Sequence, residues 1–157
     1  KIYAHHVVHG IASFEETPPT TNEMRRRWET LRNQSLPFVV AAIGNVVAGY
    51  AYAAPYRLRS AYRYTVEDAV YVDAEKSGWG IGRALLAAVI EQCTALGFRQ
   101  MIAVIGDSAN HGSIGLHRAL GFECIGNLQG VGFKHGRWVD SVYMQRALGP
   151  GETSLPE

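Results

Sequence analysis

The stretch that decides the fold runs from Val70 to Arg83 and reads Val-Tyr-Val-Asp-Ala-Glu-Lys-Ser-Gly-Trp-Gly-Ile-Gly-Arg. A short apolar strand pattern leads into three alternate glycines, at positions 78, 80 and 82, and a helical pattern follows at once. Glycines let the backbone come close to a ligand, and the N-terminus of a helix carries partial positive charge. The stretch therefore favours a phosphate or pyrophosphate site between a strand and a helix.

Two common phosphate-binding motifs are excluded by the spacing of these glycines. A P-loop requires Lys after its last glycine, whereas Arg83 follows Gly82. The dinucleotide fingerprint G-x-G-x-x-G/A ends on Arg83 when it starts at Gly78, and on Leu85 when it starts at Gly80. A glycine-rich turn without a ligand is the alternative that these residues leave open.

The rest of the chain alternates between helical and strand patterns around this stretch. Helices are predicted over residues 1–10, 20–33, 82–96 and 113–120. Strands are predicted over residues 38–43, 46–54, 67–72, 101–105, 122–128 and 139–148. This order predicts an α/β (α+β) fold, in which a mixed sheet carries helices on its faces.

Length and composition limit the class of protein. The chain has 157 residues, which fits one domain, and 47% of them are hydrophobic against 18% charged, which is typical of a folded globular chain. Fifteen Lys and Arg against 14 Asp and Glu give a net charge of +1, which argues against a nucleic-acid partner. No apolar run approaches the roughly 18 residues of a membrane span.

Three features bear on domain limits and cellular setting. We predict a single domain over residues 1–148 and a flexible tail over 149–157, since the tail has two Gly, two Pro and no apolar periodicity. A helix at the very start predicts that a first strand is absent from this chain. Cys93 and Cys124 lie in apolar contexts, so both are predicted to be reduced core residues, which points to the cytoplasm.

Two spaced motifs resemble those of a known family. The sequence Ser-Gly-Trp-Gly-Ile-Gly at 77–82 is similar to the acyl-coenzyme A loop of the GNAT N-acetyltransferases, Gln/Arg-x-x-Gly-x-Gly/Ala. Residues 110–122 resemble the second cofactor motif of that family, an Asn followed by a short helix that ends in Gly-Phe. The resemblance implies the GNAT fold, with a largely antiparallel mixed sheet, and acetyl-CoA as cosubstrate without a metal.

Further segments narrow the resemblance to the phosphinothricin N-acetyltransferase-like subfamily. They are Ser13 to Pro18, Tyr62 to Glu67, Val70 to Val72, Ala103 to Gly106 and Val131 to Trp138. The resemblance implies acetyl transfer to the amino group of a small amino-acid-like acceptor, of the phosphinothricin or methionine sulfoximine type. It also implies a cytoplasmic homodimer, with a role in antibiotic or herbicide resistance, and no membrane or nucleic-acid partner.

Two positions depart from the pattern of that subfamily. Ser77 stands where Gln or Arg is usual, which matters little because the loop binds mainly through backbone N–H groups. Ala69 stands where Thr is expected, so one hydroxyl near the acceptor is missing. Both departures leave the proposed chemistry possible.

Glu67 is the predicted catalytic base. Amide formation from a thioester needs a neutral amine, so a group must remove a proton from an ammonium acceptor. The period of two in a strand places Glu67, Ala69 and Tyr71 on one face and Asp68 on the other, with Val70 and Val72. The resemblance places the catalytic Glu of the family at Glu67, and Asp68 is its rival within the strand.

His117 is the second predicted catalytic residue. The resemblance places it where many relatives have a Tyr beside the sulfur of the cofactor, and an imidazole can protonate the departing thiolate. A histidine that only packs on a helix face is the alternative. The cofactor-binding residues that the resemblance implies are Val70, Tyr71, Val72, Ser77, Gly78, Trp79, Gly80, Ile81, Gly82, Arg83, Asn110 and Ser113. For Asn110, a helix cap is the alternative role.

The acceptor site is predicted in the loop before Glu67. Arg57 and Arg59 can clamp a carboxylate or phosphinate, with Tyr62 as an aromatic wall, although a solvated basic loop is the alternative. The resemblance adds Phe14 and Tyr52 as further walls of this pocket.

Charged residues elsewhere are given structural roles. His5, His6 and His9 have spacing that could suit a metal but no carboxylate or Cys partner, so they are interpreted as surface or packing residues. Lys134, His135 and Arg137 are predicted to form a solvated hairpin tip around Gly136, with Trp138 in the core or an interface.

Two alternatives to the predicted activity remain open. The same cofactor could serve a different amine, such as a polyamine or a protein N-terminus. A non-catalytic sensor of acyl-coenzyme A would bind the same cofactor but has no use for a base at Glu67.

Overall fold

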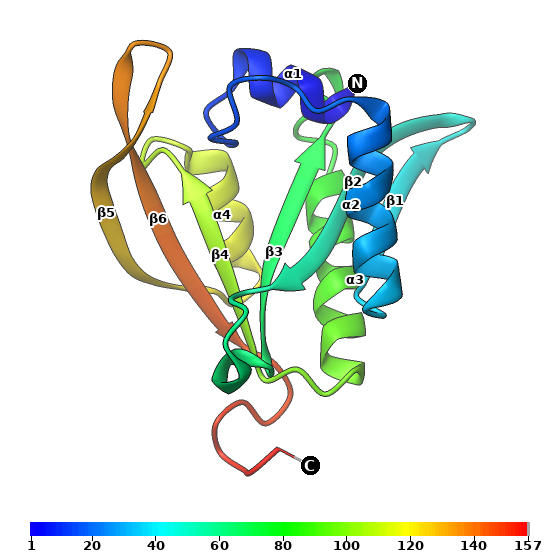
Figure 1. Ribbon diagram of the computed structural model, residues 1–157, viewed down its shortest axis with the longest axis vertical. Helices are drawn as coiled ribbons and strands as arrows, with labels where there is room; N and C mark the ends of the chain where they lie inside the picture. The colour runs from blue at the N-terminus through cyan, green and yellow to red at the C-terminus, as the bar shows by residue number, and fades with distance from the viewer. Residues whose placement is uncertain (157) are drawn as a thin grey trace.

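The computed structural model, described here for residues 1–156, is built around a six-stranded sheet (Figure 1). Its strands lie in the order β1-β2-β3-β4-β6-β5, and every neighbouring pair is antiparallel except β3 with β4. The strands are β1 Phe38–Ile43, β2 Val46–Pro55, β3 Thr65–Val72, β4 Gln100–Gly106, β5 Glu123–Lys134 and β6 Arg137–Ala147. The predicted mixed and largely antiparallel sheet is therefore confirmed.

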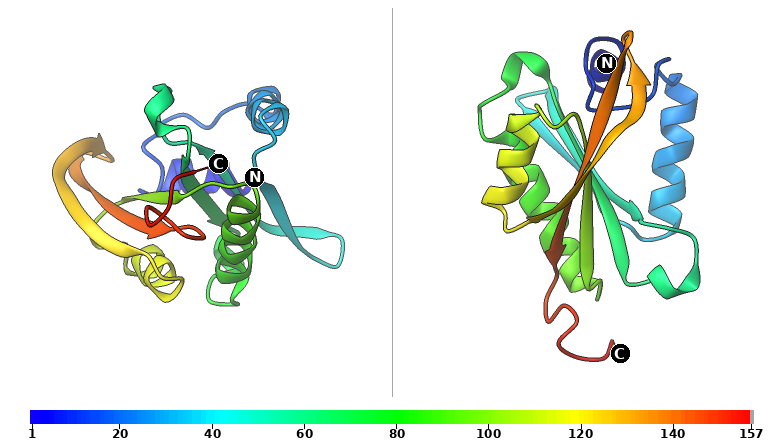
Figure 2. Two further views of the ribbon diagram at one scale, coloured as in Figure 1. Left: turned by 90° about the horizontal axis from the view of Figure 1, so that it is seen from below. Right: turned by 90° about the vertical axis from the view of Figure 1, so that its left-hand side faces the viewer.

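Helices cover both faces of the sheet, in two pairs. Helices α1 (Ile2–His9) and α2 (Thr21–Asn33) lie on one face, and α3 (Ile81–Ala95) and α4 (His111–Ala119) lie on the other (Figure 2). Two short 3₁₀ turns, η1 (Ser60–Tyr62) and η2 (Ala74–Lys76), flank β3. All four predicted helices are present, so the periodicity of the sequence located each of them.

The main core lies between α3 and the sheet. The buried face of α3 carries Leu85, Leu86, Val89, Ile90 and Cys93, at the spacing of one helical stripe. Cys93 is fully buried, but Cys124 is exposed on β5, so the prediction of a second core cysteine is wrong. Both cysteines are free thiols.

Strands β3 and β4 pair only at one end and then separate. The parallel ladder joins residues 65–67 of β3 to residues 100–102 of β4, and the two strands diverge beyond it (Figure 1). The edge of β3 that faces β4 is therefore left without a neighbouring strand from residue 68 onward. This opening passes through the sheet from the α1/α2 face to the α3/α4 face.

Strand β5 is longer than the sequence pattern predicted. It continues to Lys134, and its register with β6 shifts between Cys124 and Gly126 and between Leu128 and Gly132. A bulged strand tolerates glycines, which are untypical of regular strands. The glycines of this segment therefore hide the strand pattern in the sequence. The predicted hairpin across Gly136 is present, with positive φ at His135 and Gly136.

The hairpin tip is only partly solvated. Lys134 is buried, and its Nζ donates a hydrogen bond to the carbonyl of Ser13 at 2.6 Å, so the prediction of a solvated Lys134 is wrong. Trp138 is exposed and contacts Phe133 edge to face, which contradicts a core position. The Lys134 bond holds the segment that follows α1 against β5.

The segment after β6 is attached to the domain. Gly151 is buried, and the Arg99 guanidinium donates to the carbonyls of Gly151 and Leu155 at 3.3 and 3.1 Å. The flexibility of this tail stays a prediction, and Glu157 lies outside the described residues.

Candidate active site

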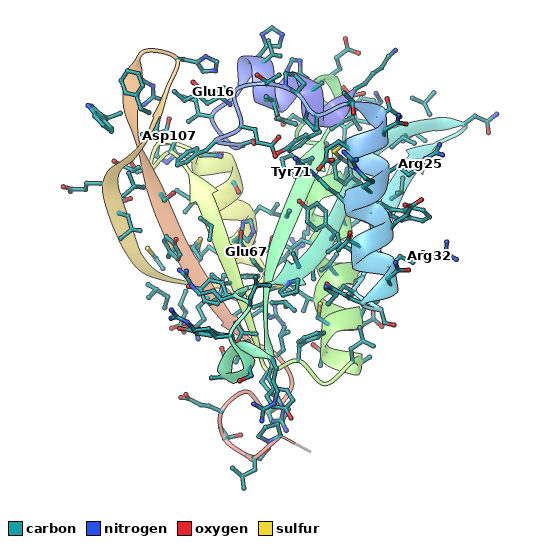
Figure 3. All side chains as sticks on the ribbon, viewed as in Figure 1. Glu16, Arg25, Arg32, Glu67, Tyr71 and Asp107 are labelled. Atoms are coloured by element: carbon teal, nitrogen blue, oxygen red, sulfur yellow. The ribbon has the colours of Figure 1, made fainter. Side chains whose placement is uncertain are left out.

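A cavity of about 280 Å³ occupies the opening between β3 and β4. Figure 3 shows Glu67 at this opening and Tyr71 farther along β3, near α1. Strand β4, helix α4 and the segment after α1 supply the remaining walls. The lining residues that were predicted from the sequence are Phe14, Glu67, Val70, Tyr71, Asn110, Ser113 and His117, joined by Asp68.

The free edge of β3 offers backbone groups to this cavity. Alternate residues of a strand direct their N–H and C=O groups to opposite edges. The N–H of Asp73 bonds to the carbonyl of Ala48 beside β2 at 2.9 Å, so Val70 and Val72 direct theirs toward the opening. His6 reaches the carbonyl of Val72 at 2.8 Å, which gives this histidine the packing role expected for it. An extended amide-containing ligand can pair with such an edge as an added strand.

The glycine loop follows directly after this edge and opens helix α3. Gly78 and Gly80 have φ values of +83° and +80°, which side-chain-bearing residues rarely adopt. Gly80 is the N-cap of α3 and provides no side-chain cap, so the first N–H groups of this 15-residue helix have no side-chain acceptor from it. A Cβ on Gly82 would lie 3.3 Å from the Leu116 side chain. The loop fits a pyrophosphate group.

The second motif forms the start of α4. The Asn110 side chain accepts a hydrogen bond from the Ser113 N–H at 3.1 Å, which is a helix cap. Both residues also line the cavity. The cap therefore fixes α4 beside the opening, and a role for Asn110 in cofactor binding stays a prediction.

Glu67 is suited to accept a proton. Tyr71 contacts Tyr3 of α1, whereas Asp68 contacts His117 of α4, so Glu67, which shares a face of β3 with Tyr71, lies on the α1/α2 face and is half-buried. Burial raises the pKa of this carboxyl, the neighbouring charge of Asp68 raises it further, and Arg57 opposes both. A carboxylate with a raised pKa is a better base near neutral pH than a solvated one.

Asp68 and His117 form a buried pair on the opposite face of β3. The two groups meet at 3.0 Å between Oδ2 and Nε2, and their side chains are 2% and 5% exposed. Burial lowers the pKa of His117, but the hydrogen bond and the charge of Asp68 outweigh it, and the net change is upward. From the sequence, Asp68 is predicted only as a rival of Glu67. The rule that a buried carboxylate needs a partner is the signal that could have found the pair.

Phe14 closes the cavity on the side of β4 and β5. Its ring covers Gly106 and Gly132, where a Cβ on Gly106 would lie 3.0 Å from the ring and a Cβ on Gly132 would overlap it. Lys134 anchors the neighbouring Ser13. Two glycines and a buried amine therefore place the predicted aromatic wall at Phe14 in the cavity that Glu67 and His117 also line.

The other predicted acceptor residues lie outside this cavity. Arg57, Arg59 and Tyr62 line a separate depression with Phe98, and Arg57 lies over the Tyr56 ring at 5.0 Å. The charge of Arg57 lowers the pKa of Glu67. Tyr52 stacks on Phe38 at 5.6 Å on the Glu67 face, and burial raises its pKa to about 12. Arg59 and Tyr62 therefore do not line the cavity that contains Glu67.

Within residues 1–156 no group of three His, Cys, Asp or Glu side chains is placed to hold a metal ion. In the same range no helix has the length and apolar character that crossing a bilayer requires.

Comparison with known proteins places this geometry in context. Residues 5–122 match the family described as acetyltransferase (GNAT). Phosphinothricin N-acetyltransferase from Alcaligenes faecalis is 53% identical over 156 residues, which cover 99% of this chain and 79% of that protein. L-Methionine sulfoximine/L-methionine sulfone acetyltransferase from Pseudomonas aeruginosa is 42% identical over 151 residues, covering 95% and 87%.

A solved structure shows the same arrangement of elements. It is a GNAT superfamily phosphinothricin acetyltransferase from Sinorhizobium meliloti in complex with acetyl-CoA, with a TM-score of 0.96 and 52% identity. The match covers 99% of this chain and 84% of the other.

Proposed function

Because this chain belongs to the acetyltransferase (GNAT) family, we propose that it transfers an acetyl group from acetyl-CoA to the amino group of a small amino-acid-like acceptor. Membership makes the chain an N-acetyltransferase, and the proposal adds the acceptor, of the phosphinothricin or methionine sulfoximine type. Its relatives that act on such molecules support this class of acceptor. The observation that carries the proposal is Glu67, a half-buried carboxylate with a raised pKa in the wall of the β3/β4 cavity.

The residues of the chain divide the chemistry among them. Acetyl-CoA, when bound, supplies the acetyl group as a thioester. Glu67 takes a proton from the acceptor ammonium and so frees the lone pair of its nitrogen. A backbone N–H on the free edge of β3, near Val72, polarises the carbonyl that is attacked. His117 supplies a proton to the sulfur.

A screen of acceptors tests this function directly. Acetyl transfer is measured over amino acids, their phosphinic and sulfoximine analogues, polyamines and peptides with free N-termini. We expect turnover with the amino-acid-like analogues. Turnover only with polyamines or peptides would show that the acceptor belongs to one of these alternative classes. Cofactor binding without turnover on any amine would identify a sensor.

Arg57 is expected to contribute to recognition of the acceptor carboxylate, because it is the arginine whose charge reaches Glu67. Arg57→Ala should raise the KM for a carboxylate-bearing acceptor by about tenfold and leave the affinity for acetyl-CoA nearly unchanged. Loss of its positive charge should also raise the pKa of Glu67. The ascending limb of the pH–rate profile should therefore move to higher pH, since Glu67 acts in its ionised form.

Arg59→Ala is the matched control for this prediction. Arg59 lies in the same exposed loop but exerts no resolved effect on Glu67, so the ascending limb should stay in place. The KM for an amino acid and for its decarboxylated amine is compared in both variants. If neither substitution raises the KM for the amino acid more than the KM for its decarboxylated amine, the proposed arginine clamp is wrong.

The assembly and setting of the enzyme also belong to the proposal. We propose a cytoplasmic homodimer that confers resistance to antibiotics or herbicides of the phosphinothricin type. A strip of exposed apolar side chains on β5 and β6 supports an interface there: Ile125, Leu128, Val131, Phe133 and Trp138. Sedimentation velocity would measure the mass in solution, and a monomer at micromolar concentration would contradict the dimer.

A further inference from the structure

Asp68 is a buried carboxylate with one of its two oxygens unused. Oδ2 contacts His117, whereas Oδ1 is buried and has no hydrogen-bond partner among residues 1–156. A buried carboxylate oxygen without a donor is costly, so a structural ion pair would be expected to satisfy both oxygens. Asp68 also lines the cavity that contains Glu67 and His117. Its position therefore indicates a role in the reaction in addition to its place in the core.

The contacts of His117 define where its protons lie. Nδ1 is 2.7 Å from the carbonyl of Ser113, and a carbonyl only accepts, so Nδ1 must carry a hydrogen. Nε2 faces Asp68 at 3.0 Å, so a proton is held between Nε2 and Oδ2. When the shared proton lies on Nε2, the ring is an imidazolium beside an ionised Asp68, and the two contacts together fix its orientation.

We propose that Asp68 is the positioning residue of His117, which holds the ring in one orientation and favours its protonated, positively charged form, ready to give a proton. This inference rests on the proposed function, in which His117 is the acid, and it assigns the charge state of that histidine. Its physical basis is that a carboxylate at hydrogen-bond distance favours the charged form of an imidazole, against the burial that disfavours it.

The step that this arrangement serves is protonation of the leaving sulfur. The acceptor nitrogen has by then formed its bond to the acetyl carbon, and it gives its remaining extra proton to water. The C–S bond breaks and its electron pair goes to sulfur, which takes the proton shared by Nε2 of His117 and Oδ2 of Asp68. His117 is then neutral with its hydrogen on Nδ1, and Asp68 is ionised beside it. The ring regains a proton from water in the opening after the products leave, which returns the pair to its starting state.

The other ionisable groups near the pair are few. Glu67 precedes Asp68 and lines the same cavity from the opposite face of the strand. Cys93 of α3 faces Asp68 from within the core, and burial raises the pKa of its thiol to about 12, so it stays neutral over the working range. On α4 itself, His117 is the residue that bonds to Asp68.

The test compares wild type with Asp68→Asn and Asp68→Ser. Both variants can keep a hydrogen bond to the ring without the charge, and two variants guard against one that fails to fold. The nitrogen shifts of His117 are followed by NMR against pH in the free protein, with His117→Gln used to assign the signal. In both variants we expect His117 to lose its proton at lower pH than in wild type.

The pH–rate profile gives the second readout. An acid that must be protonated makes kcat fall as pH rises through its pKa, by about tenfold for each pH unit above it. The descending limb should move to lower pH in Asp68→Asn. The ascending limb of Glu67 should also move to lower pH, because the charge of Asp68 raises the pKa of Glu67 in wild type. A purely structural role would lower kcat equally at every pH.

Cys93→Ala is the matched control, because it changes packing beside Asp68 and leaves the carboxylate intact. The NMR titration of His117 should be the same as in wild type. Equal titration of His117 in wild type and Asp68→Asn would overturn the proposal, as would a uniform loss of kcat. Absence of acetyl transfer in wild type would instead overturn the proposed function, since the NMR titration does not depend on turnover.

Discussion

Glu67→Gln is expected to lower kcat by about 10²–10⁴-fold near neutral pH, the usual contribution of a positioned base. The glutamine side chain keeps the size of Glu67 and can still form hydrogen bonds, but it cannot take a proton from an ammonium. Acetyl-CoA should still bind, because Glu67 lies on the α1/α2 face of β3, where the acceptor is proposed to bind, and not in the glycine loop. The measurement is steady-state kinetics with chemistry shown to be rate-limiting.

The pH dependence separates a base from a carboxylate that only positions the acceptor. Wild-type activity should rise with pH through the raised pKa of Glu67, and the variant should lack this limb. The variant should recover at high pH, where the free acceptor is already neutral. Glu75→Gln, on the exposed turn η2, is the control and should retain the wild-type profile. Near-normal kcat in Glu67→Gln would end the assignment and make His117 the leading candidate for the base.

Gly80→Val and Gly82→Val are each expected to abolish measurable binding of coenzyme A, for different reasons. Gly80 has a φ of +80°, which a β-branched residue avoids, so the loop must change its backbone path. At Gly82 a Cβ alone would lie 3.3 Å from the end of the Leu116 side chain, so the larger valine must displace that side chain or shift the start of α3. Either change displaces the N–H groups that are proposed to hold the pyrophosphate.

Calorimetry on folded protein measures this loss. Gly97→Val is a matched control, because Gly97 also has a positive φ, of +84°, but follows the far end of α3. That variant should lose stability and still bind coenzyme A. Tight binding to folded Gly80→Val and Gly82→Val would show that the cofactor lies elsewhere.

Local patterns predicted most of the fold. Helical and strand periods located four helices and six strands, because each element buries one face along its length. Strand β5 was predicted too short, since its glycines and bulges interrupt the pattern. Cys124 and Lys134 were misplaced because burial in these positions depends on how β5 meets distant segments.

The parts of the site that lie within one element could be predicted from the sequence. Contacts between residues of different elements could not be predicted as well. Strand alternation placed Glu67 and Asp68 on opposite faces, and the structure shows both faces opening into one cavity. The contact between Asp68 and His117 spans 49 positions in the sequence, and no local period reports it. Arg59 and Tyr62 are close to Glu67 in sequence, but the turn η1 directs them to another depression.

The short pairing of β3 with β4 makes the sheet two half-sheets joined at one end. Only three residue pairs connect β1-β2-β3 with β4-β6-β5 through this ladder. A ligand arm that pairs with the free edge of β3 would lie between the two half-sheets, since β4 lines the same cavity. While bound, it would stabilise the association of the halves. Ligand at 100 times its Kd stabilises a folded protein by about 2.7 kcal/mol. Because bound ligand lowers the population of opened chains that proteases can attack, we expect the abundance of this enzyme in the cell to follow the supply of its cosubstrate.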